Sequence, residues 1–297
     1  MNKAHEISIS EHERLVQEHY DKLTQGFYLQ WNRDHIHLGL FEPGECPHRN
    51  ENLKDSEGLE RALVRMLEVI VAPARIGKHH HVVDAGCGVG GTVIHLAKTR
   101  GCTVTGINLS RLQLEMADKK VNAAGLDNLV RFEYADCSRS LPFADNSVDV
   151  VVNVESARHY GNRERFLHEV KRILKPGGKI IASDWMANED LTANQYEKFI
   201  LPLCESWVMH DLERQPTYIR LLQEAGLEVL EFDGFDGRQW DNLRIIERNY
   251  QSVRLLHLCG MGGGVVFRKL MQQMERLYDT WRSGYLVVKR YFAIKPG

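Results

Sequence analysis

Residues 82–96 read VVDAGCGVGGTVIHL, which is an apolar strand, a turn that contains four glycines and the start of an apolar helix. Glycine has no Cβ, so a ligand can approach the backbone of such a turn closely. Gly86, Gly88 and Gly91 satisfy the pattern GxGxxG of dinucleotide-binding folds. The pattern alone does not decide between a pyrophosphate and another ligand.

The residues that flank the turn argue against a dinucleotide. Asp84 stands at the carboxyl end of the strand, two residues before the first glycine, where its carboxylate would repel a pyrophosphate and attract an ammonium group. Asn108, in the stretch GINLS, occupies the place of the acid that binds the ribose in dinucleotide enzymes. We therefore expect a ligand that carries a positive charge.

Short apolar stretches alternate with helical patterns on both sides of this turn. The alternation predicts an α/β fold with a doubly wound, mostly parallel sheet of seven strands between layers of helices. The expected strands are 81–86, 102–108, 130–136, 148–154, 178–185, 226–235 and 285–296. Helical patterns before the first strand predict an N-terminal cap, and a long helical insert late in the sequence predicts a lid over the substrate. We expect three units, namely the cap (1–78), the cofactor-binding core (79–185) and the rest of the sheet with the lid (186–297).

The amino-acid composition indicates which kinds of binding partner and which cellular compartment to expect. The 297 residues include 38 basic and 40 acidic side chains, a balance that argues against nucleic acid as a partner. No apolar run is long enough to span a membrane, and the polar start MNKAHEISIS has no signal-peptide core. Six scattered cysteines without a CxxC pair indicate reduced thiols, so we expect a cytoplasmic protein.

Consecutive histidines at 79–81 point to opposite faces of a strand, so we expect no metal site there. Homo-oligomerisation stays open.

Four motifs carry a family resemblance. They are VDAGCGVGG (83–91), GINLSRLQ (106–113), YADCSRSLPFADNSVDVVVNVES (134–156) and LKPGGK (174–179). In this order and spacing they resemble class I S-adenosylmethionine-dependent methyltransferases. The stretch EHYDKLTQGFYLQWNRDHIHLGLFE (18–42) is similar to segments that close over the cofactor in small-molecule members of that family. These members are C-methyltransferases of tocopherols and of sterol side chains, cyclopropane fatty-acid-type synthases and antibiotic sugar O-methyltransferases.

The resemblance implies S-adenosylmethionine as the cofactor, with a small organic molecule as the second substrate. The residues implied around the cofactor are Tyr20, Asp84, Gly86, Gly88, Asn108, Leu109, Gln113, Asp136 and Cys137. Gly86 and Gly88 would face the methionine part through their backbone, with Asp84 near its ammonium group. Gln113 would reach a ribose hydroxyl, and Asp136 would accept a hydrogen bond from the adenine amino group. The plain alternatives are a loop cap for Asp136 and an exposed helix position for Gln113.

Two sets of residues are candidates for the chemistry. Transfer from a sulfonium is an in-line displacement, so the protein mainly aligns the acceptor, the methyl group and the sulfur. Glu155 follows the fourth strand, where the resemblance implies an acid that stabilises and deprotonates the carbocation left by methylation of an alkene. His159 and Asp184 stand where related sugar O-methyltransferases carry a base and its orienting acid. A helix cap or a pair with Arg158 is the plain alternative for Glu155.

Aromatic residues complete the expected acceptor site. Tyr28, Trp31, Tyr160 and Trp185 are expected near its mouth, where a ring attracts a cation by about 0.5–2 kcal/mol. We therefore expect a methyltransferase that acts on a small, largely apolar metabolite, by preference at a carbon of an isoprenoid-like alkene. Methylation at oxygen or nitrogen of a natural product is the alternative. A non-catalytic cofactor-binding partner and a cofactor-assisted cyclase are further alternatives.

Overall fold

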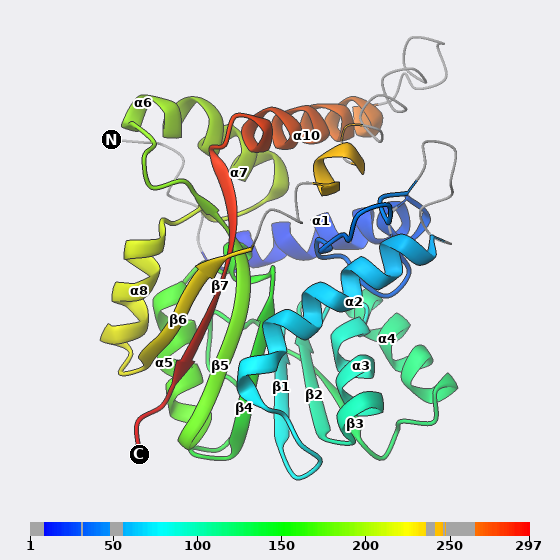
Figure 1. The fold of residues 1–297 in the computed structure, drawn as a ribbon, viewed down its shortest axis with the longest axis vertical. Helices are drawn as coiled ribbons and strands as arrows, with labels where there is room; N and C mark the ends of the chain where they lie inside the picture. Colours follow the sequence, from blue (N-terminus) through cyan, green and yellow to red (C-terminus); the bar gives the residue numbers. More distant parts are fainter. Residues whose placement is uncertain (1–8, 31, 48–55, 236–240, 246, 248–264) are drawn as a thin grey trace.

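The computed structural model describes residues 9–30, 32–47, 56–235, 241–245, 247 and 265–297, and its core is a seven-stranded sheet (Figure 1). The strands are β1 (His81–Ala85), β2 (Thr103–Asn108), β3 (Val130–Tyr134), β4 (Val148–Val154), β5 (Leu174–Ala187), β6 (Glu228–Gly234) and β7 (Leu286–Ile294). Their order across the sheet is β3-β2-β1-β4-β5-β7-β6, and only β7 runs antiparallel to its neighbours. The predicted α/β fold with a mostly parallel seven-stranded sheet is confirmed.

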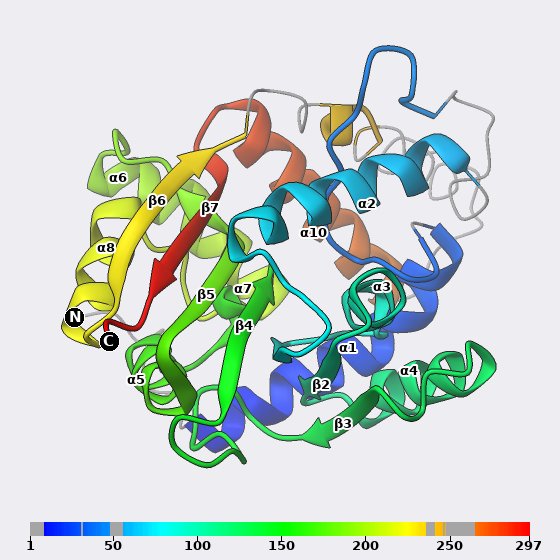
Figure 2. The ribbon, with the colours of Figure 1, turned by 60° about the horizontal axis from the view of Figure 1, so that its bottom comes forward.

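Helices cover both faces of the sheet and its carboxyl edge (Figures 1 and 2). They are α1 (Ile9–Gln30), α2 (Glu57–Val71), α3 (Gly91–Arg100), α4 (Arg111–Ala123), α5 (Arg163–Ile173), α6 (Ala193–Gln195), α7 (Leu201–Trp207), α8 (Gln215–Glu224) and α10 (Val265–Arg282). Single 3-10 turns occur at Ala72–Ala74 and Ala157–His159, and a π-helical segment, Tyr196–Ile200, joins α6 to α7. None of these helices, in the described part of the protein, is long and apolar enough to cross a membrane.

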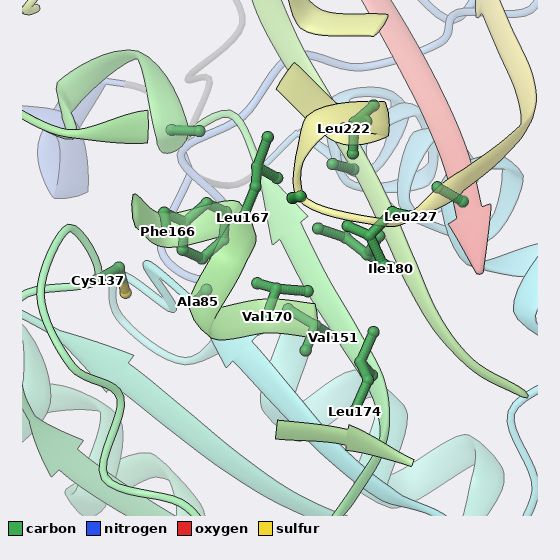
Figure 3. Close-up of a cluster of buried hydrophobic side chains, with 14 of the residues drawn as sticks. Ala85, Cys137, Val151, Phe166, Leu167, Val170, Leu174, Ile180, Leu222 and Leu227 are labelled. Atoms are coloured by element: carbon green, nitrogen blue, oxygen red, sulfur yellow. The ribbon is translucent and has the colours of Figure 1, made fainter. Parts of the chain in front are cut away.

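The alternation of side chains along the strands builds two separate cores. Val82, Val150 and Ile181 point to one face, where they pack with α2, α3 and α4. Val83 and Val151 point to the other face, where they pack with α5 and α8 (Figure 3). Successive side chains of a strand point to opposite faces, so a run such as VDVVVNV is apolar throughout because both faces are covered.

Local signals fix the helix boundaries near the site. The Ser110 hydroxyl accepts a hydrogen bond from the Gln113 amide at 3.1 Å and so caps the start of α4. Gly101 ends α3 in the left-handed conformation, with φ at 64°. α5 ends at Ile173, and β5 begins at Leu174, two residues before Pro176, which cannot continue a helix.

A third core lies above the carboxyl edge of the sheet. It joins Leu38, Leu40 and Phe41 to side chains of α2, the end of β5, α7 and α10. α10 packs against α7, so the late helical part of the protein sits over the same edge as α1 (Figure 1). This core draws on all three expected units, and the division at residues 78 and 185 stays a prediction.

Candidate active site

The glycine turn follows β1, and its glycines differ in their backbone conformation and in their neighbours. Gly86, Gly88 and Gly90 have positive φ angles of 83°, 54° and 87°, which residues with a side chain rarely adopt. A Cβ at Gly86 would collide with the Ser156 side chain, and one at Gly90 would lie 2.9 Å from Cβ of Ala117. These two glycines therefore allow close packing of the backbone against neighbouring parts of the protein.

Gly88 and Gly91 have opposite surroundings. A Cβ at Gly91 would collide with the backbone of Asp34, whereas a Cβ at Gly88 would find nothing nearer than Cδ1 of Ile36, at 4.0 Å. Gly88 thus combines a left-handed backbone conformation with open space in front of it. Open space before a glycine with positive φ is what close approach of a ligand to the backbone requires.

A pocket opens in front of this turn, at the carboxyl ends of β1, β2 and β4. Its walls come from α1, from the segment before α2, from the glycine turn, from the start of α4 and from the loop after β4. The lining residues are Val16, Gln17, Tyr20, Asp34, His35, Ile36, His37, Asp84, Gly86, Cys87, Gly88, Val89, Gly91, Thr92, Asn108, Leu109, Ser110, Gln113, Ala135, Cys137, Val154, Glu155, Ser156, Arg158, His159 and Tyr160. Ligands of open α/β sheets bind at this edge, so the pocket lies where the sequence predicted it.

Asp84 is the unsatisfied group of this pocket. Its side chain is buried, and Oδ2 has no hydrogen-bond partner among the described residues. Burial raises the pKa of the Asp84 carboxyl to about 7. A buried carboxylate without a partner costs several kcal/mol, on the order of a lost charge-assisted hydrogen bond or more, so a cationic ligand would stabilise this site.

The second part of the pocket is preorganised by Asn108 and Gln113. The Asn108 amide donates to Oε1 of Gln113 at 2.7 Å and to the Gly88 carbonyl at 3.3 Å. Nε2 of Gln113 donates to the Thr24 hydroxyl of α1 at 2.9 Å. Gln113 is 2% exposed, so it is not the surface residue of the plain alternative. Leu109 and Cys137 line the pocket beside this pair.

Asp136 is engaged with its own loop. Its Oδ1 accepts from the amide and the hydroxyl of Ser138, both at 2.8 Å, and Oδ2 lies 2.8 Å from the same hydroxyl and 3.4 Å from Arg139. This is the geometry of the loop cap, and the side chain is not part of the pocket lining given by the described residues. Contact of Asp136 with the adenine stays a prediction.

Glu155 faces the pocket from the end of β4. It has a positive φ of 51°, a conformation that persists in a residue with a side chain only where the surroundings enforce it. Its Oε1 accepts from the Leu38 amide at 3.0 Å, and Oε2 accepts from Nε1 of Trp185 at 2.7 Å. Burial raises the pKa of the Glu155 carboxyl to about 7, although the positive charge of Arg158 acts in the opposite direction. A carboxyl with such a pKa exchanges a proton near neutral pH.

His159 and Asp184 are not joined to each other. Asp184 accepts from the guanidinium of Arg158 at 2.9 Å and from the Arg158 amide at 2.8 Å, and it does not line the pocket. His159 shares a 2.8 Å hydrogen bond through Nε2 with the Tyr20 hydroxyl, and its Nδ1 lies 3.1 Å from the Val208 carbonyl. Nδ1 therefore carries the proton and Nε2 accepts. Burial, followed by the charge of Arg158, holds the pKa of His159 well below its usual value.

The aromatic residues expected at the acceptor site have different surroundings. The Tyr160 hydroxyl lies 2.9 Å from the Asn153 amide and 3.0 Å from the Ser156 hydroxyl, next to Gly86. Trp185 does not line the pocket but donates to Glu155 from the third core. The Tyr28 side chain and Trp31 lie outside the described residues, so their contact with substrate stays a prediction.

Helix α1 closes the pocket through polar contacts with two elements, the turn that contains His159 and the start of α4. Besides the Tyr20–His159 and Thr24–Gln113 hydrogen bonds, Asp21 accepts from the Ser110 hydroxyl at 2.5 Å. Tyr20 lines the pocket, and its contact with the cofactor stays a prediction. No signal in the sequence singled out Thr24 or Asp21 as the partners of α4.

The segment before α2 contributes residues that the sequence motifs did not assign. His35 and His37 line the pocket, and their ring nitrogens Nδ1 and Nε2 lie 3.2 Å apart. Nδ1 of His37 lies 2.7 Å from the Leu38 carbonyl, and burial lowers the pKa of His37 to about 4. Both histidines belong to the stretch HIHLGLFE, whose resemblance marked it as a closing segment without giving its side chains a role.

Comparisons with known proteins place this chain in a family. Residues 83–182, which hold the turn and the loop with Glu155, match the family model described as a methyltransferase domain. Methyltransferase GfsG from Streptomyces halstedii is 32% identical over 222 residues, which span 73% of this chain and 74% of that protein. The chain belongs to the S-adenosylmethionine-dependent methyltransferases.

One further relative and one solved structure extend the comparison. The methyltransferase described here is 31% identical over 228 residues to tocopherol O-methyltransferase from Arabidopsis thaliana, over 73% of this chain and 63% of the relative. Its fold matches the crystal structure of geranyl diphosphate C-methyltransferase from Streptomyces coelicolor A3(2) with a TM-score of 0.73 and 17% identity, over 96% of this chain and 98% of that one. The enzyme is thus a small-molecule methyltransferase, and S-adenosylmethionine is its cofactor.

The residues present fit this cofactor. The partnerless oxygen of Asp84 suits the ammonium group of its methionine part, and the open face of Gly88 admits a ligand to the backbone. S-adenosylmethionine carries a positive charge, as expected for the ligand from Asp84 and Asn108. The predicted cofactor identity is confirmed, whereas the individual contacts stay predictions.

Proposed function

We propose that the enzyme methylates a carbon of a small, largely apolar acceptor of the isoprenoid-like alkene type, and that Glu155 receives the proton that the acceptor loses. The observation that carries the proposal is the state of Glu155, a buried carboxyl that faces the pocket with a pKa of about 7. The fold accommodates such a reaction in geranyl diphosphate C-methyltransferase.

The cofactor end of the site rests on Asp84, Gly88 and Gln113. Asp84 would hold the ammonium group, Gly88 would pass close to the methionine part, and Gln113 would reach the ribose. When bound, S-adenosylmethionine supplies an electrophilic methyl group on a positively charged sulfur. The hydrogen bonds from α1 to His159 and Gln113 would close the site and keep water out.

The acceptor end rests on Glu155. The π-electron pair of the alkene forms the new carbon–carbon bond while the carbon–sulfur pair remains on sulfur, so the acceptor becomes a carbocation. Loss of a neighbouring proton to Glu155 restores the double bond, and the carboxyl becomes neutral. Because the carboxyl must be ionised to accept the proton, turnover rises as the pH increases through about 7.

A second candidate is methylation at oxygen or nitrogen, and the relative named tocopherol O-methyltransferase favours it. His159 would then be the base, because Nε2 accepts a hydrogen bond at the pocket wall. Asp184 would stabilise Arg158 rather than orient His159.

Product analysis with a 13C-labelled methyl group on the cofactor tests the proposal. Incubation with a panel of prenyl alkenes, phenols and amines should give an alkene product heavier by one methyl group, whose 13C chemical shift identifies a carbon-bound methyl. An oxygen- or nitrogen-bound methyl supports the second candidate. An isomerised product without added mass indicates a cyclase, and no product with any acceptor, in protein that binds S-adenosylhomocysteine, indicates a non-catalytic cofactor-binding partner.

A further inference from the structure

Residues 32–41, which we call the strap, run along the pocket from the glycine turn to Glu155. Asp34 and His37 line the pocket, and the Leu38 amide donates to Oε1 of Glu155 at 3.0 Å. The strap has no regular secondary structure beyond its bends. Its hydrogen bonds to other elements therefore fix where the Leu38 amide points.

One side of the strap rests on α2. The Leu40 amide donates to the Ala62 carbonyl at 2.9 Å, and Arg65 donates to the Leu40 carbonyl at 2.6 Å. A Cβ at Gly39 would lie 2.9 Å from Cβ of Ala62, so glycine allows the strap to approach this helix. These contacts hold residues 39 and 40 against α2. They do not involve the amide or the carbonyl of Gly39, which bind another residue.

Asn242 is that partner. Its Oδ1 accepts from the Gly39 amide at 3.0 Å, and its Nδ2 donates to the Gly39 carbonyl at 2.7 Å. The side chain is 0% exposed, and Ile245, one helical turn further on, is buried in the third core. A buried asparagine that satisfies both backbone groups of one residue fixes that residue in position and orientation.

We propose that Asn242 is a positioning residue for Glu155, acting through Gly39 and the Leu38 amide. The inference deepens the proposed function, since it assumes that Glu155 takes part in turnover. Asn242 lies 203 residues from Gly39 in the sequence and is not among the described residues that line the pocket, so it would act on the acceptor chemistry from outside the pocket.

The expected consequence concerns the proton affinity of Glu155. The charged groups that act on this carboxyl are Arg158 at its own loop and Asp184 on β5, whereas the titratable Tyr20 on α1 is neutral because burial raises its pKa. A hydrogen bond from the Leu38 amide favours the ionised form. If a substitution removes the side-chain amide of Asn242, the backbone amide of Leu38 moves away from Oε1 of Glu155. The Glu155 carboxyl then ionises at higher pH.

The experiment compares Asn242→Leu, which keeps the branched shape of the side chain, and Asn242→Ala with the control Asn188→Ala. Asn188 also donates to a backbone carbonyl, that of Gly284 at 2.9 Å, but it does not contact the strap. All three substitutions exchange one neutral side chain for another, so they change no charge near Glu155. Each is first titrated with S-adenosylhomocysteine, whose affinity should match that of the wild type because Asp84 is untouched.

The first readout is the pKa of Glu155, measured by infrared difference spectroscopy of the carboxyl band against a Glu155→Gln reference. It should rise by about one unit in both Asn242 variants and remain at its wild-type value in Asn188→Ala. The second readout is the pH profile of kcat, whose midpoint should rise in parallel, with kcat at pH 6.5 reduced about eightfold.

The outcomes separate the inference from the proposed function. A shifted pKa with an unshifted kcat profile retains the positioning role and refutes Glu155 as the base. An unshifted pKa in a folded Asn242→Leu variant that binds S-adenosylhomocysteine overturns the positioning role, whatever the kcat profile shows. If Asn242→Ala does not fold, Asn242→Leu alone decides.

Discussion

Asp84 and Glu155 are two buried carboxyls at the ends of the adjacent strands β1 and β4, and burial raises the pKa of each to about 7. They differ in their partners. Both oxygens of Glu155 accept hydrogen bonds from the protein, whereas Oδ2 of Asp84 has no partner within the described ranges. The protein itself holds both oxygens of Glu155 in place, whereas the partnerless oxygen of Asp84 would be stabilised by a cationic ligand. The difference supports the proposed assignment of Glu155 to the acceptor and of Asp84 to the cofactor.

Glu155→Gln should have the largest effect. Glutamine cannot take the proton of the acceptor, so kcat should fall about 100-fold or more, in the range of a lost general base. The measurement is single-turnover methyl transfer, with the affinity for S-adenosylhomocysteine expected within twofold of the wild type. Glu169→Gln is the matched control, because Glu169 also accepts from a backbone amide, that of Leu141 at 2.7 Å, but lies away from the pocket. Retained turnover in Glu155→Gln, with loss in His159→Asn, would shift the chemistry to oxygen or nitrogen.

Asp84→Asn should have the next largest effect, on binding. Loss of a buried charge partner costs at least about 2 kcal/mol, which corresponds to a roughly 30-fold weaker affinity for S-adenosylhomocysteine at pH 8. The melting temperature of the ligand-free variant should not fall, because the exchange removes a buried carboxylate that lacks a partner. Asp149→Asn is the control, because Asp149 lies near the amino end of β4, away from the pocket. Calorimetry measures the affinity of both variants for S-adenosylhomocysteine. Equal affinities in the two variants would remove Asp84 from the cofactor site.

The pH dependence of cofactor binding tests the difference between Asp84 and Glu155 further. Asp84 must be ionised to pair with an ammonium group, and below its pKa of about 7 it is mostly protonated in the ligand-free protein. The affinity for S-adenosylhomocysteine should therefore rise about tenfold from pH 6 to pH 8. Titrations at four pH values measure this slope, which should persist in Glu155→Gln and disappear in Asp84→Asn. A slope that survives in Asp84→Asn would point to another titrating group.

Alanine at two glycines of the turn should give the smallest but most selective effects. Gly88→Ala should fold and bind S-adenosylhomocysteine about fivefold more weakly, because its Cβ enters the open space before the backbone. Gly86→Ala should instead lower the melting temperature, since its Cβ collides with the Ser156 side chain. Thermal unfolding with and without ligand distinguishes the two. The reverse result would mean that Gly86, not Gly88, faces the ligand.

The sequence predicted the sheet and the cofactor end because their signals are local. The glycine turn, Asp84 and the Ser110 cap that places Gln113 each lie within a few residues of a strand end. The alternation of apolar runs with helical patterns was sufficient to place all seven strands, with ends that differ from those of the structure by a few residues.

The acceptor end was less predictable because it is assembled from residues that lie far apart in the sequence. Asp184 looked like a partner of His159, but Arg158 is nearer and binds it through both its side chain and its backbone. Asn242 gave no signal at all, since a polar residue in a helical stretch is ordinary. Only the fold shows that it holds Gly39, and the contacts of Trp31 and Tyr28 remain predictions.

The most direct test of this account counts the protons released when the cofactor site is filled. Calorimetric titration of S-adenosylhomocysteine into the wild-type enzyme at pH 6, in two buffers of different ionisation enthalpy, gives this number from the difference in heat. We predict close to one proton released by the wild type and by Glu155→Gln, and none by Asp84→Asn. Release of no proton by the wild type, or an equal release by Asp84→Asn, would contradict the claim that a cation completes the unsatisfied carboxyl at the end of β1.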